Sequence, residues 1–261
     1  MVWTRTSQPQ GRIVQFQFDT TTISVNVPHA AALLAAAKAR LAEGRGFALA
    51  TINLDHLVKL GQDPAFRTAY AAQDFVVADG NPIVWLSRLA RRPVQLVPGS
   101  EMVLPLARIA AQTGARIALL GGTEASLAAA AARMQAEIPA LQIALQIAPP
   151  MGFDVEGVDA TAMLRQLDAE GIGLCFLALG APKQEIMAAR GRKLAPRTGF
   201  ASIGAGLDFL AGSQTRAPEW AQKIAMEWAW RMMSNPRRLV PRYWACAKLL
   251  PSQVMQALRM R

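Results

Sequence analysis

The chain has 261 residues, of which 52% are hydrophobic and 18% charged, and its net charge is +10. This length and apolar content suffice for one full hydrophobic core, so we expect one compact domain with a terminal extension. No stretch has the ~18 to 20 apolar residues that a membrane-spanning helix needs, and the N-terminus lacks the apolar segment of a signal peptide. Cys175 and Cys246 are far apart and without metal-ligand spacing, which argues against a disulfide or a zinc site.

Strand and helix patterns follow each other along most of the chain. Residues 12–18 and 22–27 alternate apolar and polar side chains around Asp19, Thr20 and Thr21, which predicts a β-hairpin. Short apolar runs then predict strands at 47–53, 75–79, 116–121, 141–148, 173–180 and 199–204. Alanine-rich segments between them predict helices at 29–42, 64–72, 82–90, 101–113, 124–137, 158–170 and 182–194. This alternation predicts an α/β fold with a mostly parallel, Rossmann-like sheet covered by helices on both faces.

The composition changes at about Gly212, so we divide the chain into an α/β core (1–211) and a helical C-terminal appendage (212–261). The appendage has nine basic and two acidic residues, and it holds four of the six tryptophans. Such a mixture suits an anionic phosphate or the headgroup layer of a membrane. The plain alternative is an amphipathic helix pair that packs on the core. Nucleic acid is not an expected partner, because zinc-finger, basic leucine-zipper and RNA-recognition signatures are missing from the sequence.

Polar or glycine-rich segments follow five of the predicted strands. In a parallel sheet, the loops at the carboxyl ends of the strands build the binding crevice. Glycines there let the backbone approach a phosphate closely, and the next helix offers its N–H groups. Each segment also has a structural alternative, such as a tight turn with Thr123 as the helix N-cap. The segments are Thr51-Ile52-Asn53, Asp79-Gly80-Asn81, Gly121-Gly122-Thr123-Glu124, 180–185 and 204–208.

Asp79 ends a β-branched run and precedes a glycine, so its carboxylate is expected at the rim of the crevice, where it can act as a base. An ordinary Asp-Gly turn is the alternative. Thr51 and Asn53 have uncharged hydrogen-bonding groups of the kind that orient sugar hydroxyls, and the alternative for both is satisfaction of the local backbone.

Taken together, these segments resemble the WecG/TagA/CpsF family of glycosyltransferases, which make bacterial cell-surface polysaccharides. The likeness covers residues 12–244. In one departure, Val97-Pro98-Gly99-Ser100-Glu101 stands where many relatives have an arginine before the Gly-Ser pair and an aspartate after it, so the donor sugar does not carry over. The matching segments, in family order, are Thr51-Ile52-Asn53, Ala78-Asp79-Gly80, Gly99-Ser100, 119–122, 179–185, 204–209, Arg216-Ala217-Pro218, Glu227-Trp228, Arg231, 236–239 and Arg242-Tyr243.

The resemblance implies an inverting, hexose-transferring enzyme that moves an N-acetylmannosamine-type sugar from UDP to a polyprenyl-diphosphate-linked saccharide. It also implies peripheral attachment to the inner face of the cytoplasmic membrane. The general base would be Asp79. The sequence has no Asp-X-Asp triplet, so no metal or other cofactor is expected, and the diphosphate would be covered by Arg231, Arg238 and Arg242. The implied substrate-binding residues are Thr51, Asn53, Asn81, Gly121, Gly122, Gly180, Lys183, Gln184, Glu185 and Asp208.

Three alternatives stay open on the sequence. The first keeps the chemistry and uses a UDP-glucose-type donor in exopolysaccharide assembly. The second is a nicotinamide-dependent dehydrogenase, although Thr51-Ile52-Asn53 stands where a G-x-G-x-x-G motif would open the first strand–helix unit. The third is a non-catalytic sugar-nucleotide-binding or scaffold protein, against which Asp79 and the appendage arginines argue. The acceptor linkage and the oligomeric state stay open, and a homo-oligomer is compatible with the sequence.

Overall fold

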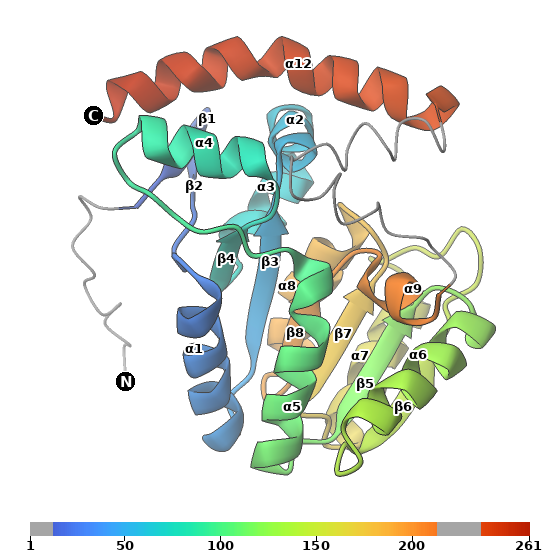
Figure 1. Ribbon diagram of the computed structural model, residues 1–261. Coiled ribbons are helices and arrows are strands. Elements are labelled where there is room, and N and C mark those ends of the chain that lie inside the picture. Colours follow the sequence, from blue (N-terminus) through green and yellow to red (C-terminus); the bar gives the residue numbers. More distant parts are fainter. Residues whose placement is uncertain (1–12, 213–235) are drawn as a thin grey trace.

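The computed structural model describes residues 13–212 and 236–261, and Figure 1 shows their arrangement. The elements in chain order are β1 (Gln15–Phe18), β2 (Thr21–Ser24), α1 (Ala30–Ala42), β3 (Phe47–Ile52), α2 (Leu54–Gln62), α3 (Pro64–Ala71), β4 (Phe75–Ala78), α4 (Asn81–Leu89), the 3-10 turn η1 (Gly99–Glu101), α5 (Val103–Thr113), β5 (Ile117–Gly121), α6 (Glu124–Glu137), β6 (Ile143–Ile147), α7 (Val158–Ala169), β7 (Leu174–Ala178), α8 (Lys183–Leu194), β8 (Gly199–Ser202), α9 (Gly206–Leu210) and α12 (Pro236–Arg259).

Six strands form one sheet in the order β4-β3-β8-β7-β5-β6, and every neighbouring pair is parallel. The expected parallel α/β sheet is therefore confirmed. The N-terminal hairpin is also confirmed: β1 and β2 pair antiparallel, with Phe16 opposite Ile23. Because all six strands run the same way, their carboxyl ends lie at one edge of the sheet, which α12 crosses in Figure 1.

Helices cover both faces of the sheet, which explains why β3 is apolar except for Thr51. Its six residues are all buried. Phe47 and Leu49 face the cluster formed with α1, α5 and α6, whereas Ala48 faces α7 and α8. Ile52 joins a third cluster under the hairpin, α2, α3 and α4. A strand buried on both faces has no polar alternation, which is the pattern of a central parallel strand.

Two helices were not expected from the sequence. Helix α2 begins directly after Asn53, whose side chain accepts a hydrogen bond from the amide of His56 at 3.0 Å and so caps the helix. The short α9 begins at Gly206, within the glycine-rich segment that follows β8.

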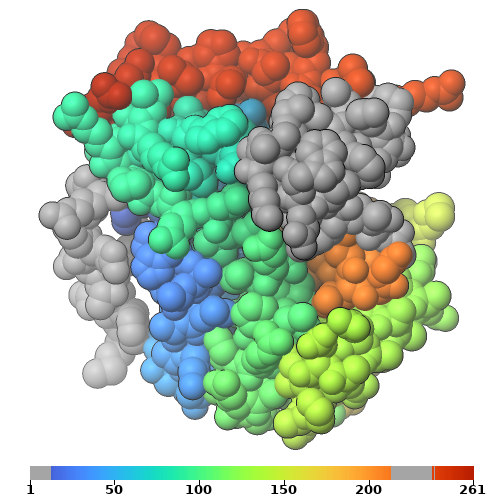
Figure 2. All heavy atoms as spheres, viewed as in Figure 1, coloured from blue at the N-terminus to red at the C-terminus, as the bar shows by residue number. Residues whose placement is uncertain are grey.

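Helix α12 lies across the carboxyl end of the sheet and contacts α2 and α4 (Figure 1). Its inner face holds the buried side chains of Cys246, Gln253 and Ala257. Figure 2 shows α12 along one margin of the molecular surface, with α4 directly beneath it. Within residues 13–212 and 236–261, no helix is both long enough and apolar enough to cross a bilayer. The division of the chain at residue 212 stays a prediction.

Candidate active site

The residues predicted from the strand ends lie at the carboxyl edge of the sheet, where α12 packs on α2 and α4. Contacts between neighbouring loops show which of them meet. A Cβ atom on Gly80 would lie 3.7 Å from Cβ of Asn53, so the loops after β3 and β4 touch. A Cβ atom on Gly122 would lie 3.7 Å from Oδ1 of Asp208, so the loop after β5 meets α9. The amide of Gly204 donates to Oε1 of Gln184 at 3.1 Å and joins the loops after β7 and β8.

Asp79 directly follows β4 and is half-buried. Its amide donates to the carbonyl of Ile52 at 2.7 Å, which fixes the strand end beside β3. Gly80 has φ +114° and is the N-cap of α4, without a side-chain capping bond. Asn81 is therefore the first residue of that helix, and Asp79 stands at the turn between strand and helix.

Thr51 and Asn53 occupy the end of β3 with different degrees of exposure. Asn53 is half-buried and its Oδ1 caps α2, so the alternative of local backbone satisfaction is confirmed for this side chain. Thr51 is only 3% exposed. A Cβ atom on Gly99 would lie 3.1 Å from Cγ2 of Thr51, so η1 packs directly on this residue.

The turn after β5 needs glycine at two successive positions. Gly121 has φ +118°, and a Cβ atom there would lie 2.4 Å from the carbonyl oxygen of Ala178, a distance that no side chain can adopt. Gly122 has φ +71° and a Cβ atom would meet Oγ of Ser126 at 2.7 Å. Thr123 and Ser126 form a reciprocal capping box, which confirms the alternative that Thr123 is the N-cap of α6.

The loop of residues 180–185 leads from β7 into α8 and buries a carboxyl group. Nε2 of Gln184 donates to Oε1 of Glu185 at 2.8 Å. Burial raises the pKa of Glu185 to about 7, while the Gln184 bond and the charge of Lys59 act in the opposite direction. Oε2 of Glu185 has no hydrogen-bond partner among the described residues. Nζ of Lys183 donates to the carbonyl of Phe153 at 2.7 Å, so its ammonium group holds the loop between β6 and α7.

A buried polar pair next to this loop was missed in the sequence. Nδ1 of His56 lies 3.1 Å from the hydroxyl of Tyr70. Burial lowers the pKa of His56 to about 3 against the opposing charge of Asp55, so the imidazole is neutral at physiological pH. Burial, followed by the charges of Glu185 and Asp79, raises the pKa of Tyr70 well above its ordinary value.

Of the three predicted appendage arginines, only Arg242 has a described side chain. Its Nε lies 2.9 Å from Oδ1 of Asp55, while Oδ2 of Asp55 lies 2.9 Å from Nζ of Lys59. Arg231 lies outside the described residues, and so does the side chain of Arg238. Asp55 and Lys59 were not predicted as site residues. Their signal in the sequence is the i,i+4 spacing of an acidic and a basic residue on a helix capped by Asn53.

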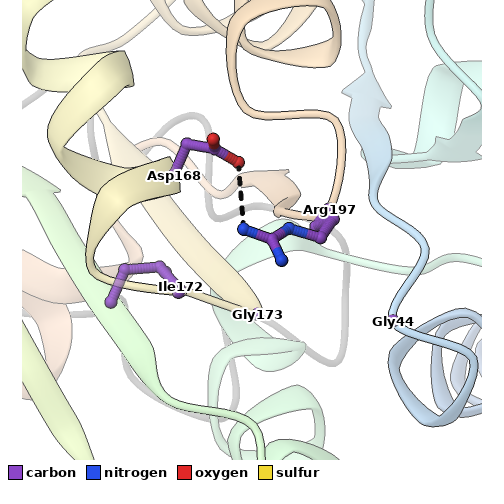
Figure 3. A pocket seen from close by; sticks show the side chains of 6 residues that line it. Gly44, Asp168, Ile172, Gly173 and Arg197 are labelled. Atoms are coloured by element: carbon purple, nitrogen blue, oxygen red, sulfur yellow. Dashed lines mark ion pairs between the residues drawn. The ribbon is translucent and has the colours of Figure 1, made fainter.

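A shallow depression opens at the opposite, amino end of the sheet (Figure 3). Asp168 and Arg197 face each other there, with 3.7 Å between Oδ1 and Nη2. This pair neutralises itself, and the other lining residues have no side-chain hydrogen-bonding group. The depression therefore lacks the residues that sugar-nucleotide chemistry requires, and we place the candidate active site at the carboxyl end. The lining residues are Gly44, Asp168, Gly171, Ile172, Gly173 and Arg197.

A metal site requires several ligand side chains close together. Among the described residues, no three His, Cys, Asp or Glu side chains are grouped so that they could hold a metal ion. The expectation that activity needs no metal stays a prediction.

Comparison with known proteins gives a consistent match. The sequence pattern of the glycosyl transferase WecG/TagA/CpsF family matches residues 18–261. The chain is 25% identical over 221 residues to an N-acetylglucosaminyldiphosphoundecaprenol N-acetyl-beta-D-mannosaminyltransferase of Bacillus spizizenii, covering 84% of this chain and 81% of the relative. It is 26% identical over 216 residues to a protein of the same name from Bacillus subtilis strain 168, covering 82% and 80%.

Proposed function

The chain belongs to the WecG/TagA/CpsF family of glycosyltransferases, and from this premise we propose that it transfers an N-acetylmannosamine-type sugar from UDP to a polyprenyl-diphosphate-linked saccharide, with inversion. The names of the two Bacillus relatives support this donor sugar and a lipid-diphosphate acceptor. The single structural observation that carries the proposal is the half-buried Asp79 at the carboxyl end of β4, next to the end of β3.

Inversion requires one displacement at the anomeric carbon. The acceptor hydroxyl oxygen forms the new bond, the bond to the β-phosphate oxygen of UDP breaks, and the hydroxyl proton goes to the carboxylate of Asp79. A general base must lie within hydrogen-bond reach of that hydroxyl. The position of Asp79 at a strand–helix turn at the carboxyl end of the sheet supports this role.

The neighbouring loops supply groups for the donor. Asn81 and Nδ2 of Asn53, whose Oδ1 caps α2, would orient the sugars, and the buried Thr51 would hold the end of β3 in position. The amides of the two glycine turns can approach phosphate oxygens closely because the glycines have no side chain. The nucleotide would be bound by Gly122, Gly180, Lys183 and Asp208, and the buried Gly121, Gln184 and Glu185 would hold these loops in position.

The leaving diphosphate needs positive charge, and we assign this role to Arg231, Arg238 and Arg242 without a metal ion. A guanidinium group stays charged at all physiological pH values and binds two phosphate oxygens at once. Arg242 lies on α12, which crosses the carboxyl end of the sheet (Figure 1). This position supports a C-terminal contribution to the site.

The outer face of α12 supports docking at the membrane that holds the lipid acceptor. Val240, Trp244, Met255 and Leu258 are 49%, 63%, 55% and 40% exposed, and we call these four residues the outer stripe. Their spacing places them on one side of the helix. Residues 236–261 contain no acidic side chain, and Nζ of Lys248 lies 5.5 Å from the centre of the Trp244 ring. Exposed apolar and basic groups on one helix fit an anionic interface.

A transfer assay with the purified full-length chain tests the proposal. The acceptor is a short-chain polyprenyl-diphosphate N-acetylglucosamine, and UDP-N-acetylmannosamine competes with UDP-glucose. We expect a disaccharide product from the N-acetylmannosamine donor, with UDP released in equal amount. Exclusive transfer of glucose would show that the donor is UDP-glucose. No transfer from either donor would contradict the proposed function.

A further inference from the structure

Asp55 lies between two cationic side chains, one from α2 and one from α12. It is part of α2, and its side chain is only 11% exposed. Oδ2 is 2.9 Å from Nζ of Lys59, one turn further along the same helix. Oδ1 is 2.9 Å from Nε of Arg242 on α12. We infer that Asp55 is a positioning residue that couples the docking of α12 to the position of the 180–185 loop.

Lys59 connects Asp55 to this loop. Besides its contact with Asp55, Nζ of Lys59 donates to the carbonyl oxygen of Ala181 at 3.0 Å. Ala181 stands two residues before Lys183, at which α8 begins. The Lys59 ammonium group is therefore held between a carboxylate and the backbone of the loop. If Asp55 moves, Lys59 loses the partner that keeps it directed at Ala181.

Arg242 connects Asp55 to the C-terminal helix. Cys246, one turn further along α12, is buried on the inner face of the helix, where α12 contacts α2. An ordinary i,i+4 pair on an exposed helix would contribute little, because water screens both charges. Here the carboxylate is buried and each of its cations reaches a segment distant in sequence. Burial of the carboxylate strengthens both contacts, although water still screens the side chains of Lys59 and Arg242, which are 34% and 38% exposed.

The chain of contacts from Arg242 through Asp55 and Lys59 to Ala181 has a functional consequence. When α12 is docked, the loop is held in one position, and when α12 is released, the loop gains freedom. The consequence for catalysis depends on the proposed function, because there the 180–185 loop binds the donor. The mechanical coupling itself does not depend on it.

A double-mutant cycle on the full-length chain tests the coupling. The four proteins are the unchanged chain, Arg242→Gln, Lys59→Gln and the double variant. The primary measurement is hydrogen exchange of the peptide that covers residues 180–186, without ligand. We expect Arg242→Gln to accelerate exchange about threefold to tenfold when Lys59 is present, and less than twofold when residue 59 is Gln. Asp55→Glu should keep slow exchange, whereas Asp55→Asn should not.

A control variant and a second measurement distinguish failure of the coupling from failure of the proposed function. Arg133→Gln removes an exposed i,i+4 ion pair with Glu137 on α6 and should leave exchange of the 180–186 peptide unchanged. The affinity for UDP, measured by titration calorimetry, should fall in Arg242→Gln in both backgrounds, because Arg242 is also assigned to the diphosphate, so this measurement tests the proposed function and hydrogen exchange tests the coupling. Equal acceleration of exchange in both backgrounds, or none in either, overturns the coupling. Intact coupling in a chain that does not bind UDP would retain this inference and contradict the proposed function.

Discussion

Asp74 and Glu185 are two carboxyl groups at different levels of the same sheet, and their partners differ. Near the amino end, Oδ2 of Asp74 accepts hydrogen bonds from the amide of Ala48 and from Nε of Arg192, both at 2.9 Å, and Oδ1 lies 3.5 Å from Arg40. Near the carboxyl end, Glu185 is fully buried, and its Oε2 has no hydrogen-bond partner among the described residues.

The two carboxyl groups therefore differ in their effect on the stability of the fold. A carboxylate with arginine and backbone partners stabilises the elements it joins, here β4, α1 and α8. A buried polar atom without a partner destabilises the protein by itself, so its retention needs a reason other than stability. Among the described residues, Oγ of Ser202 at the end of β8 is another such atom, and Oε1 of Gln73, the residue that precedes Asp74 near the amino end, is a further one. The carboxyl end therefore has such atoms beside the predicted catalytic residues, but not exclusively.

The largest effect should come from Asp79→Asn at the carboxyl end. Turnover should fall about 10²-fold or more, because the variant cannot accept the acceptor proton. Binding of UDP and the thermal unfolding temperature should stay close to those of the unchanged chain. Steady-state kinetics with saturating donor measure the loss. A turnover within twofold of normal would show that Asp79 is not the general base.

Loss of one appendage arginine should have the next largest effect. Arg231→Ala and Arg238→Ala should each reduce turnover on a water-soluble acceptor analogue about tenfold or more, because the leaving diphosphate loses a charged donor. Arg197→Ala, at the depression in Figure 3, is the control and should leave turnover unchanged.

Pelleting with anionic vesicles separates the two roles of the appendage. If the two arginine variants lose vesicle binding but keep turnover on the soluble analogue, the appendage is a membrane anchor only. The diphosphate would then have to be held by the loops around Gly121 and Lys183.

Asp74→Asn should lower the stability of the protein and leave its activity nearly unchanged, the opposite of what we expect for Asp79→Asn. Because Asp74 joins two arginines and a backbone amide, the free energy of unfolding should fall by about 1 to 3 kcal/mol. Turnover and KM should stay within about twofold of normal. Chemical denaturation and steady-state kinetics on the same preparation measure both. A large loss of turnover in a folded Asp74→Asn protein would remove the distinction between the two ends.

Glu185→Gln should change how stability depends on pH. The pKa of Glu185 is about 7 in the folded protein, against an ordinary value of 4.5. Between these values the unfolded chain loses the proton and the folded chain keeps it, so the contribution of Glu185 is present below about pH 4.5 and is lost as pH rises to about 7. The Gln variant should gain stability relative to the unchanged chain, on the order of 3 kcal/mol, between pH 4.5 and 8. Denaturation at several pH values measures this difference, and a constant difference would show that Glu185 is ionised in the fold.

Removal of metal ions should have the smallest effect. We expect transfer activity in EDTA to equal that in buffer, because arginines are assigned to the charge of the diphosphate. The assay compares initial rates before and after dialysis against EDTA. Complete loss of transfer that manganese or magnesium restores would show that the diphosphate is neutralised by a metal.

Most of the elements could be predicted because apolar runs and helical periodicity are local properties. The strand β3 and the helix α6, for example, lie within one or two residues of their predicted ranges. Helix α2 was missed because Asn53 was interpreted as a sugar ligand, although the same residue signals a helix start. The order of the strands was not predictable, since it depends on which non-adjacent strands pair.

The candidate site was predictable at the level of loops and not at the level of contacts. Parallel strands bring their carboxyl ends to one edge, so Asp79, Gly122 and Asp208 could be assigned to a common region. The pair of His56 and Tyr70 joins two helices by a buried hydrogen bond that leaves no periodic signal. The hydrogen bond from Lys183 to the carbonyl of Phe153 could not be predicted from the sequence either, because it depends on how the loop after β6 folds back.

Hydrogen exchange with and without UDP tests most directly that the carboxyl end of the sheet is the functional end. We expect slower exchange in peptides covering residues 121–124, 180–186 and 204–208 when UDP is present. We expect no change in peptides that cover residues 168–173 and 197, at the depression of the amino end. Protection of the amino-end peptides, with unchanged exchange at the carboxyl-end loops, would place UDP binding at the amino end instead.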